Sequence, residues 1–490
     1  MNLRMPTAGI IIMGITITST TEPHVRPGPD CFRMCFILNR TLVPGALRQR
    51  TDEDNNMTTF RVRDIFILGF LNFALFVGAG NIIFPPLIGL QAGTSVWFAA
   101  MGFLLTGVGL PVITAIAMAK AGGSLSAITR PTGRICGMAL TLACYLCIGP
   151  IFAIPRTATV SYELALQHYH VNKSGLPLWS LIFFSLVILV SLYPGRLLDT
   201  VGKFLSPLKI IALLVLTVTA VLIPAGAPMP PQGLYATSPF SQGITNGYLT
   251  MDTLAALVFG LVIVRAIQSR GVTSPRLITR YALYSGLIAG VGLVVVYAGL
   301  FRLGLSSSGL IEGATNGAQV ISAYVHFSYG AAGDIFLGVL MTLACLVTAI
   351  GLTSACGSWF SDHTRFSYRT CIWFFAIVSM LISNIGLTQL INLSVPVLTA
   401  IYPVFVVLIL TFFFREKFHS TTLVIIPAAF VTFLFGLAEA LNSSGGPRWL
   451  ASLTASMPLH NQGLAWLLPA ASIVFVMSII DHVRYKRESR

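Results

Sequence analysis

The sequence predicts an all-α integral membrane protein with about twelve transmembrane helices, and three observations lead to this fold class. Of 490 residues, 55% are hydrophobic and only 9% are charged, which excludes a soluble globule. The apolar residues gather in runs of roughly 20, long enough to cross a bilayer core of about 30 Å. Two of these runs also contain residues that interrupt a helix partway along the span.

The predicted spans form two groups and a final pair. The first group covers about 64–225, the second about 246–414, and the pair about 421–481, so we expect residues 57–490 to form one polytopic domain. The approximate limits of the spans are 64–91, 95–119, 135–158, 177–194, 204–225, 246–268, 279–303, 332–356, 370–387, 390–414, 421–441 and 462–481.

The first span contains a helix break. Gly78 and Gly80 flank a single alanine, Asn81 follows, and two prolines close the segment. An unpaired backbone amide or carbonyl in hydrocarbon is costly, so the irregular backbone is expected to line a binding site. Half-helix N-termini suit a carboxylate, and freed carbonyls suit a cation or an ammonium group. An amino acid with a small cation fits both ends. The alternative, a small-residue packing face, fits this spacing less well.

The formal charge of +14 reports membrane topology. Basic residues concentrate in alternate loops and in the C-terminal tail, while the other loops hold little beyond Lys173, Arg302 and Arg448. This asymmetry places both termini in the cytoplasm, and nucleic-acid binding is not expected. The loops predicted to be cytoplasmic hold Lys120, Arg130, Arg134, Arg196, Lys203, Arg270, Arg276, Arg280, Arg365, Arg369, Arg415 and Lys417.

The eight cysteines are scattered, most of them within spans. Cys144 and Cys147 form a C-x-x-C pair, but they lie in an apolar helix without a histidine or carboxylate partner. Small packing residues are the better interpretation. We expect no disulfide and no metal cluster.

Residues 1–56 do not resemble the rest of the chain, because their apolar run is too short to span and the remainder lacks periodicity. We expect an N-terminal extension that is disordered or belongs to a mis-assigned start. The acidic run 52–54 must be encoded by purine-rich codons that can spell a ribosome-binding sequence upstream of Met57. On this hypothesis Met57 is the true start, although a signal peptide is an alternative.

The third span carries charge at its end. Arg156 and Glu163 lie seven residues apart, two turns along one helical face. They form either a gate pair in an outer vestibule or plain interfacial anchors.

The sixth span shows a second interruption. Gly260 interrupts its apolar run, Asp252 and Thr253 lie near its outer end, and Arg265 lies near its cytoplasmic end. Interruptions at positions one and six predict an inverted five-plus-five repeat with the site between the breaks.

In the eighth span, Thr353 and Ser354 are adjacent hydroxyls in an otherwise apolar helix. Either they bond back to carbonyls of their own helix, or they help to coordinate a hard cation such as sodium. Beside a broken first helix we favour the cation.

Several runs resemble those of the bacterial branched-chain amino acid:cation symporters of the BrnQ type. The similarity covers Met57 to about residue 482, and the runs that carry it are 73–86, 149–159, 199–203, 256–260 and 394–403. The resemblance implies a LeuT-like fold with discontinuous helices 1 and 6, in a bacterial inner membrane. It implies import of leucine, isoleucine and valine coupled to sodium, or to protons in some members, with no cofactor beyond the coupling ion.

The resemblance also implies two sets of site residues. The substrate carboxylate is expected near the amides of Ala79 and Gly80, with the carbonyl of Phe76 offered to the ammonium group. Asn81 serves a second cation or braces the unwound turn. The substrate set is Phe76, Gly78, Ala79, Gly80, Tyr145, Val258, Phe259 and Gly260; the cation set is Ala74, Val77, Asn81, Ile350, Thr353 and Ser354.

Competing functions fit less well. A channel would need a repeated filter motif or an acidic ring, and an enzyme would need a nucleophile and a base within the spans. A cation-coupled transporter of another small amphipathic solute remains the alternative.

The coupling ion stays open between sodium and protons. The absence of a carboxylate beside the first break favours sodium, yet Asp252 could titrate and so favour protons. Arg265 departs from the small neutral residue expected there, so either it snorkels inward or this copy is impaired. The oligomeric state stays open.

Overall fold

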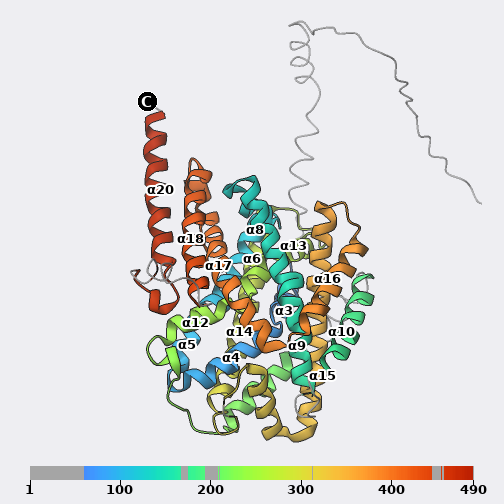
Figure 1. Cartoon of the computed structure of the whole chain (residues 1–490). Helices are drawn as coiled ribbons and strands as arrows, with labels where there is room; N and C mark the ends of the chain where they lie inside the picture. Colours follow the sequence, from blue (N-terminus) through green and yellow to red (C-terminus); the bar gives the residue numbers. More distant parts are fainter. Residues whose placement is uncertain are drawn as a thin grey trace, which may run out of the picture. The chain divides into compact units, whose positions relative to one another are not determined.

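The computed structural model describes residues 60–166, 175–193, 208, 210–311, 313–443, 454 and 457–488 (Figure 1). The chain divides into two units, Met1–Met57 and Thr58–Arg490, and every described residue belongs to the second. The predicted extension at 1–56, its alternative start and the run at 199–203 lie outside the described residues.

Every regular element of the described residues is helical, as predicted, and they contain no strand. Single π-helical turns at Leu105–Gly109 and Cys147–Ile151 link α5 to α6 and α8 to α9. The α-helices are α3 (Val62–Phe76), α4 (Ala79–Ala92), α5 (Val96–Leu104), α6 (Leu110–Lys120), α7 (Leu125–Thr129), α8 (Arg134–Leu146), α9 (Ala153–Leu166), α10 (Gly175–Ser191), α12 (Pro239–Tyr248), α13 (Asp252–Gln268), α14 (Pro275–Leu305), α15 (Gly317–His363), α16 (Tyr368–Ser383), α17 (Leu387–Phe414), α18 (Thr421–Ser443) and α20 (Leu467–Glu488).

Seven helices among the described residues are long and apolar enough to cross a membrane. The pair α12 and α13, bent by 40° at its break, makes an eighth if it is one span. Three shorter apolar helices, at Gly175–Ser191, Ile210–Leu222 and Tyr368–Ser383, overlap further predicted spans. The protein is therefore a multi-pass membrane protein, while the count of about twelve spans remains a prediction.

The first predicted break lies where the glycines indicate. Helix α3 ends at Phe76, Val77 leaves the helical region with ψ 85°, and Gly78 is extended with ψ −167° before α4 begins at Ala79. Pro85 and Pro86 lie inside α4 rather than ending it. Two non-helical residues are thus enough to interrupt the span.

The second break exists, but its predicted position was wrong. The chain leaves the helix after Tyr248 and re-enters it at Asp252, with Met251 in the left-handed region at φ 64°. Gly260 lies within the continuous helix α13, where a Cβ would collide with Met118 of α6. Its glycine therefore serves close helix packing and not a change of backbone direction.

The two broken helices pack in a reciprocal way. Both halves of the first, α3 and α4, pack against α14, the helix that follows the second broken helix. The halves of the second, α12 and α13, pack against α5 and α6, which follow the first broken helix. Helices α9 and α15 also pack extensively against each other, and in Figure 1 they run side by side.

Candidate functional site

The two breaks meet at Gly80. A Cβ on this residue would lie 3.1 Å from the carbonyl oxygen of Thr250 and 3.5 Å from Nη1 of Arg156. Only glycine allows the backbone of α4 to come this close to the second break. Residues far apart in the sequence are thereby brought to one point.

A cavity of about 40 Å³ lies at this point. Helices α3, α4, α9, α13 and α15 and the second break all contribute to its lining. Of the predicted substrate residues it contains Phe76, Gly78, Ala79, Gly80 and Phe259. Pockets that enclose a small-molecule ligand measure roughly 300–1,000 Å³, so the cavity as it stands is too small to enclose an aliphatic amino acid.

Asn81 braces the first break and ties it to two other helices. Its Oδ1 accepts a hydrogen bond from the amide of Gly78 at 3.2 Å. Its Nδ2 donates to Oδ2 of Asp252 at 2.6 Å and to the hydroxyl of Tyr297 in α14. The Tyr297 hydroxyl also donates to Oδ2 of Asp252, at 3.3 Å. These hydrogen bonds brace the first break, while a role of Asn81 at a second cation stays a prediction.

Arg156 lies at the same cavity, buried to 2% exposure. Its Nη1 donates to the carbonyl of Leu249 at 2.7 Å, and its Nη2 donates to Oγ of Ser394 in α17 at 2.9 Å. The guanidinium carbon also lies 5.5 Å from the centroid of the Phe84 ring, within cation–π range. The interpretation of Arg156 as an interfacial anchor is therefore wrong.

Glu163 does not pair with Arg156. Its carboxylate accepts a hydrogen bond of 2.9 Å from the side-chain amide of Asn316, which also caps the start of α15. The predicted gate pair does not form, because Arg156 and Glu163 are each hydrogen-bonded to other residues, far away in the sequence.

A wider cavity of about 620 Å³ begins directly beside the small one. Leu75 and Phe259 border both cavities and so mark where the two adjoin. The predicted Tyr145 and Val258 line the wide cavity, and the Tyr145 ring stacks on Trp359 at 4.6 Å. We name this cavity the vestibule.

Charged side chains lie at the open part of the vestibule. Arg265, Asp362 and His363 line it and are exposed. They border the loops that the charge pattern predicts to be cytoplasmic. Arg265 thus reaches water and avoids the expense of a charge in hydrocarbon, as the snorkelling alternative expects.

Thr353 and Ser354 do not bond back to their own helix. The Thr353 hydroxyl oxygen is buried and has no hydrogen-bond partner among the described residues, whereas the buried Ser354 hydroxyl lies within reach of the Tyr368 hydroxyl. Ser354 lines the vestibule, whereas Thr348 and Leu352 line the small cavity. Ile350 is buried one turn before Ser354. Whether this group joins Ala74 and Val77 around a cation stays a prediction.

Several residues at the site did not follow from the sequence. Thr250, Met251 and Asp252 line the small cavity, and Tyr297 and Ser394 hold its charged groups. The second break contains no glycine or proline, so the usual signal of a break was missing. A buried carboxylate within an apolar span was the one available indication.

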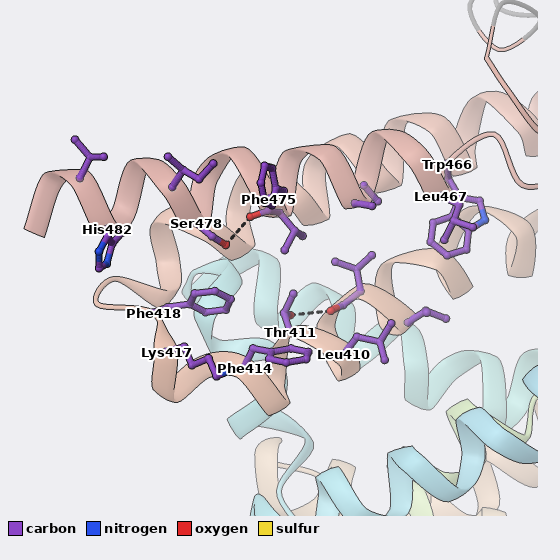
Figure 2. A pocket seen from close by; sticks show the side chains of 17 residues that line it. Leu410, Thr411, Phe414, Lys417, Phe418, Trp466, Leu467, Phe475, Ser478 and His482 are labelled. Carbon is purple, nitrogen blue, oxygen red and sulfur yellow. Dashed lines mark hydrogen bonds between the residues drawn. The ribbon is translucent and has the colours of Figure 1, made fainter.

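A second large cavity, of about 710 Å³, lies between α17 and α20 (Figure 2). Its polar groups are few: Lys417 and His482 lie near one end. Thr411 and Ser478 donate to carbonyls of their own helices, Val407 and Val474, and so offer no donor to a ligand. We name this cavity the apolar groove.

Comparison with known proteins decides the family. A family model described as "Branched-chain amino acid transport protein" matches residues 61–484. The chain belongs to the branched-chain amino acid transport proteins. Within this family it is 54% identical over 433 residues to the "Branched-chain amino acid transport system 3 carrier protein" of Pseudomonas aeruginosa, covering 87% of the chain and 98% of that relative. It is also 52% identical to the "Branched-chain amino acid permease BrnQ" of Escherichia coli, covering 86% of the chain and 96% of that relative. These relatives are transporters, in agreement with the expectation of a protein that is not an enzyme.

Solved structures share the fold of this family member at low identity. A nucleobase-cation-symport-1 family transporter, in a closed conformation with bromovinylhydantoin bound, matches with a TM-score of 0.58 and 16% identity, covering 87% of the chain and 93% of that structure. A manganese transporter of Eremococcus coleocola matches with a TM-score of 0.56 and 12% identity, covering 88% and 98%. The architecture is therefore the LeuT-like transporter fold, as predicted.

Proposed function

We propose that the protein imports leucine, isoleucine and valine across a bacterial inner membrane, driven by a sodium or proton gradient. The observation that carries this proposal is the small polar cavity where two interrupted helices meet, in a chain that belongs to this family. Helix interruptions at mid-membrane depth are tolerated where they bind a solute or an ion.

The reciprocal packing of the broken helices supports an inverted five-plus-five repeat. Each broken helix packs on the helix that follows the other, which is the relation that two inverted copies of one unit produce. With this repeat we propose twelve spans and transport by alternating access, in which one bundle rocks against the other around a fixed site.

The vestibule supports an inward-facing state of this cycle. It reaches exposed charged residues near loops predicted to be cytoplasmic, while Leu75 and Phe259 mark where it adjoins the small cavity. On the other side, Arg156 ties the second break to α17 through Leu249 and Ser394. The outer path is then closed by hydrogen bonds and the inner path by two apolar side chains.

Sodium is the coupling ion that the hydroxyl pair on α15 supports. Neither Thr353 nor Ser354 bonds back to its own helix, as Ser and Thr of membrane helices commonly do, and the Thr353 oxygen is buried without a partner among the described residues. We propose that they bind sodium together with backbone oxygens of Ala74 and Val77 near the end of α3.

The test is uptake of labelled leucine into proteoliposomes that carry the purified protein, under an imposed sodium gradient and then a proton gradient. Sodium-driven uptake that isoleucine and valine inhibit, and that Thr353→Ala with Ser354→Ala abolishes, supports the function and the ion site. Uptake driven by protons alone overturns the sodium site. An absence of leucine uptake under both gradients overturns the function.

A further inference from the structure

We infer that Arg156 and Asp252 bind the two charged ends of the amino acid, Arg156 the carboxylate and Asp252 the ammonium group. This inference rests on the proposed function, since it names the side chains that recognise the substrate of the same site. Neither residue belongs to the substrate set expected from the family resemblance.

Both side chains are ionisable groups at the small cavity. Arg156 is exposed to 2% and Asp252 to 2%, and both border this cavity. Among the described residues they form no ion pair with each other. An isolated buried charge is strongly unfavourable, and ionisable residues inside a membrane mark substrate or ion sites.

The existing partners of both residues are neutral. Arg156 donates to a backbone carbonyl and a serine hydroxyl, while its Nε has no partner among the described residues. Asp252 accepts from Asn81 and Tyr297, both through Oδ2. Each charge is therefore hydrogen-bonded but lacks a counter-charge. A zwitterion supplies one of each sign and leaves the site with no net charge.

The proposed places of the substrate carboxylate and ammonium group agree with the charge that the dipole of the neighbouring helix end favours. Nη1 of Arg156 points to the vicinity of Gly80, in the first turn of α4, where the helix dipole favours a carboxylate. Phe76 is the last residue of α3, where the dipole favours a cation. Asn81, one residue beyond Gly80, joins the first break to Asp252.

The apolar residues between the small cavity and the vestibule determine where the aliphatic side chain of the substrate lies. The small cavity measures about 40 Å³, well below the roughly 300 Å³ of the smallest usual ligand pockets, so it encloses only part of the amino acid. Leu75 and Phe259 lie on its border with the vestibule. A branched aliphatic chain is then accommodated when these two side chains move aside toward the vestibule.

The two charges make separable predictions for substrate analogues. The unaltered protein should select leucine over 4-methylpentanoate, which lacks the amino group, and over 3-methylbutylamine, which lacks the carboxylate. Hydrogen bonds to charged groups change binding by roughly 10- to 100-fold. Asp252→Asn should narrow the selectivity against 4-methylpentanoate by about this factor, and Arg156→Gln should narrow the selectivity against 3-methylbutylamine.

The experiment is competition of each analogue against labelled leucine for binding to the purified protein, in parallel with leucine uptake into proteoliposomes. Glu163→Gln is the matched control, because it removes a half-buried carboxylate of α9 that lies outside the small cavity. Arg156→Lys keeps the charge and should retain more leucine binding than Arg156→Gln. Thermal unfolding of each variant separates loss of binding from loss of folding.

The possible results point to different conclusions. The inference is supported if Asp252→Asn loses selectivity mainly against 4-methylpentanoate and Arg156→Gln loses selectivity mainly against 3-methylbutylamine. Unchanged analogue selectivity in both variants overturns it, as does an equal change for both analogues, which indicates a purely structural role. If the unaltered protein neither binds nor transports leucine, the proposed function fails and the inference fails with it.

Discussion

Two cavities of this protein differ in nearly every respect. The small cavity between the breaks measures about 40 Å³ and is bordered by two buried ionisable side chains. The apolar groove between α17 and α20 measures about 710 Å³, and two hydroxyls in its wall are bonded to their own helices. Volume alone would assign the ligand to the groove.

The comparison indicates that the binding site lies where side chains are buried at an energetic cost, and not where the cavity is largest. Burying Arg156 and Asp252 without a counter-charge lowers stability, so their presence needs another explanation. The apolar groove holds no buried carboxylate or guanidinium; its one buried polar atom without a partner among the described residues is the indole Nε1 of Trp466, and the rest of its wall matches lipid acyl chains. Four substitutions test this contrast.

The largest effect is expected at Gly80. Gly80→Ala places a Cβ 3.1 Å from the Thr250 carbonyl, tighter than an ordinary contact, and so forces the two breaks apart. Overpacking of this kind costs about 1–3 kcal/mol, and we expect leucine uptake to fall by on the order of 100-fold. Gly109→Ala is the control, because its Cβ would meet nothing closer than 3.8 Å. Equal initial uptake rates in the two variants would contradict the close approach.

The second-largest loss of uptake is expected when the Asn81 side chain, which braces the first break, is removed. Asn81→Ala removes the acceptor of the Gly78 amide and one donor to Asp252. A buried group left without a partner costs about 1–3 kcal/mol, so uptake should fall roughly tenfold or more. Asn246→Ala removes hydrogen bonds of similar length outside the small cavity and should keep its uptake. An Asn81→Ala protein as active as this control would show that the brace is dispensable.

A moderate effect on selectivity is expected from the border between the small cavity and the vestibule. Phe259→Ala widens this border, so phenylalanine should compete with leucine more strongly, by about tenfold, since one methylene in a pocket is worth about 1–3 kcal/mol. Val262→Ala truncates a residue that lines the vestibule alone and serves as control. Inhibition constants for phenylalanine that agree between the two variants would rule out a selective border at Phe259.

The smallest effect is expected in the apolar groove. Ala471→Phe fills part of it from α20, at an exposed position. Leucine uptake should stay within about twofold of the unaltered protein, because surface substitutions away from special features are nearly neutral. A loss of uptake comparable to that of Gly80→Ala would reverse the comparison and assign a role in transport to the groove.

How much the sequence could predict depended on local signals. The all-helical class and the first break followed from apolar runs and from Gly78 and Gly80, whose effect on the backbone is local. The second break was placed at Gly260, nine residues too late, because Met251 adopts a positive φ that ordinary side chains rarely allow. Tertiary packing stabilises that conformation, and no local pattern indicates it.

The roles of charged residues were the least predictable. Arg156 and Glu163 share a helical face, which suggested a pair, but the true partners are more than 90 and 150 residues away, at Leu249 and Asn316. Spacing along one helix identifies which residues can meet each other, and says nothing of what other helices bring.

The close approach at Gly80 also has a consequence for the history of the gene. Every glycine codon begins with two guanines, and a change of either base encodes a residue with a Cβ or a stop. No single substitution at the first two codon positions therefore preserves the contact with Thr250. Third-position changes are silent, so the nucleotide sequence at this codon can drift while the amino acid stays fixed.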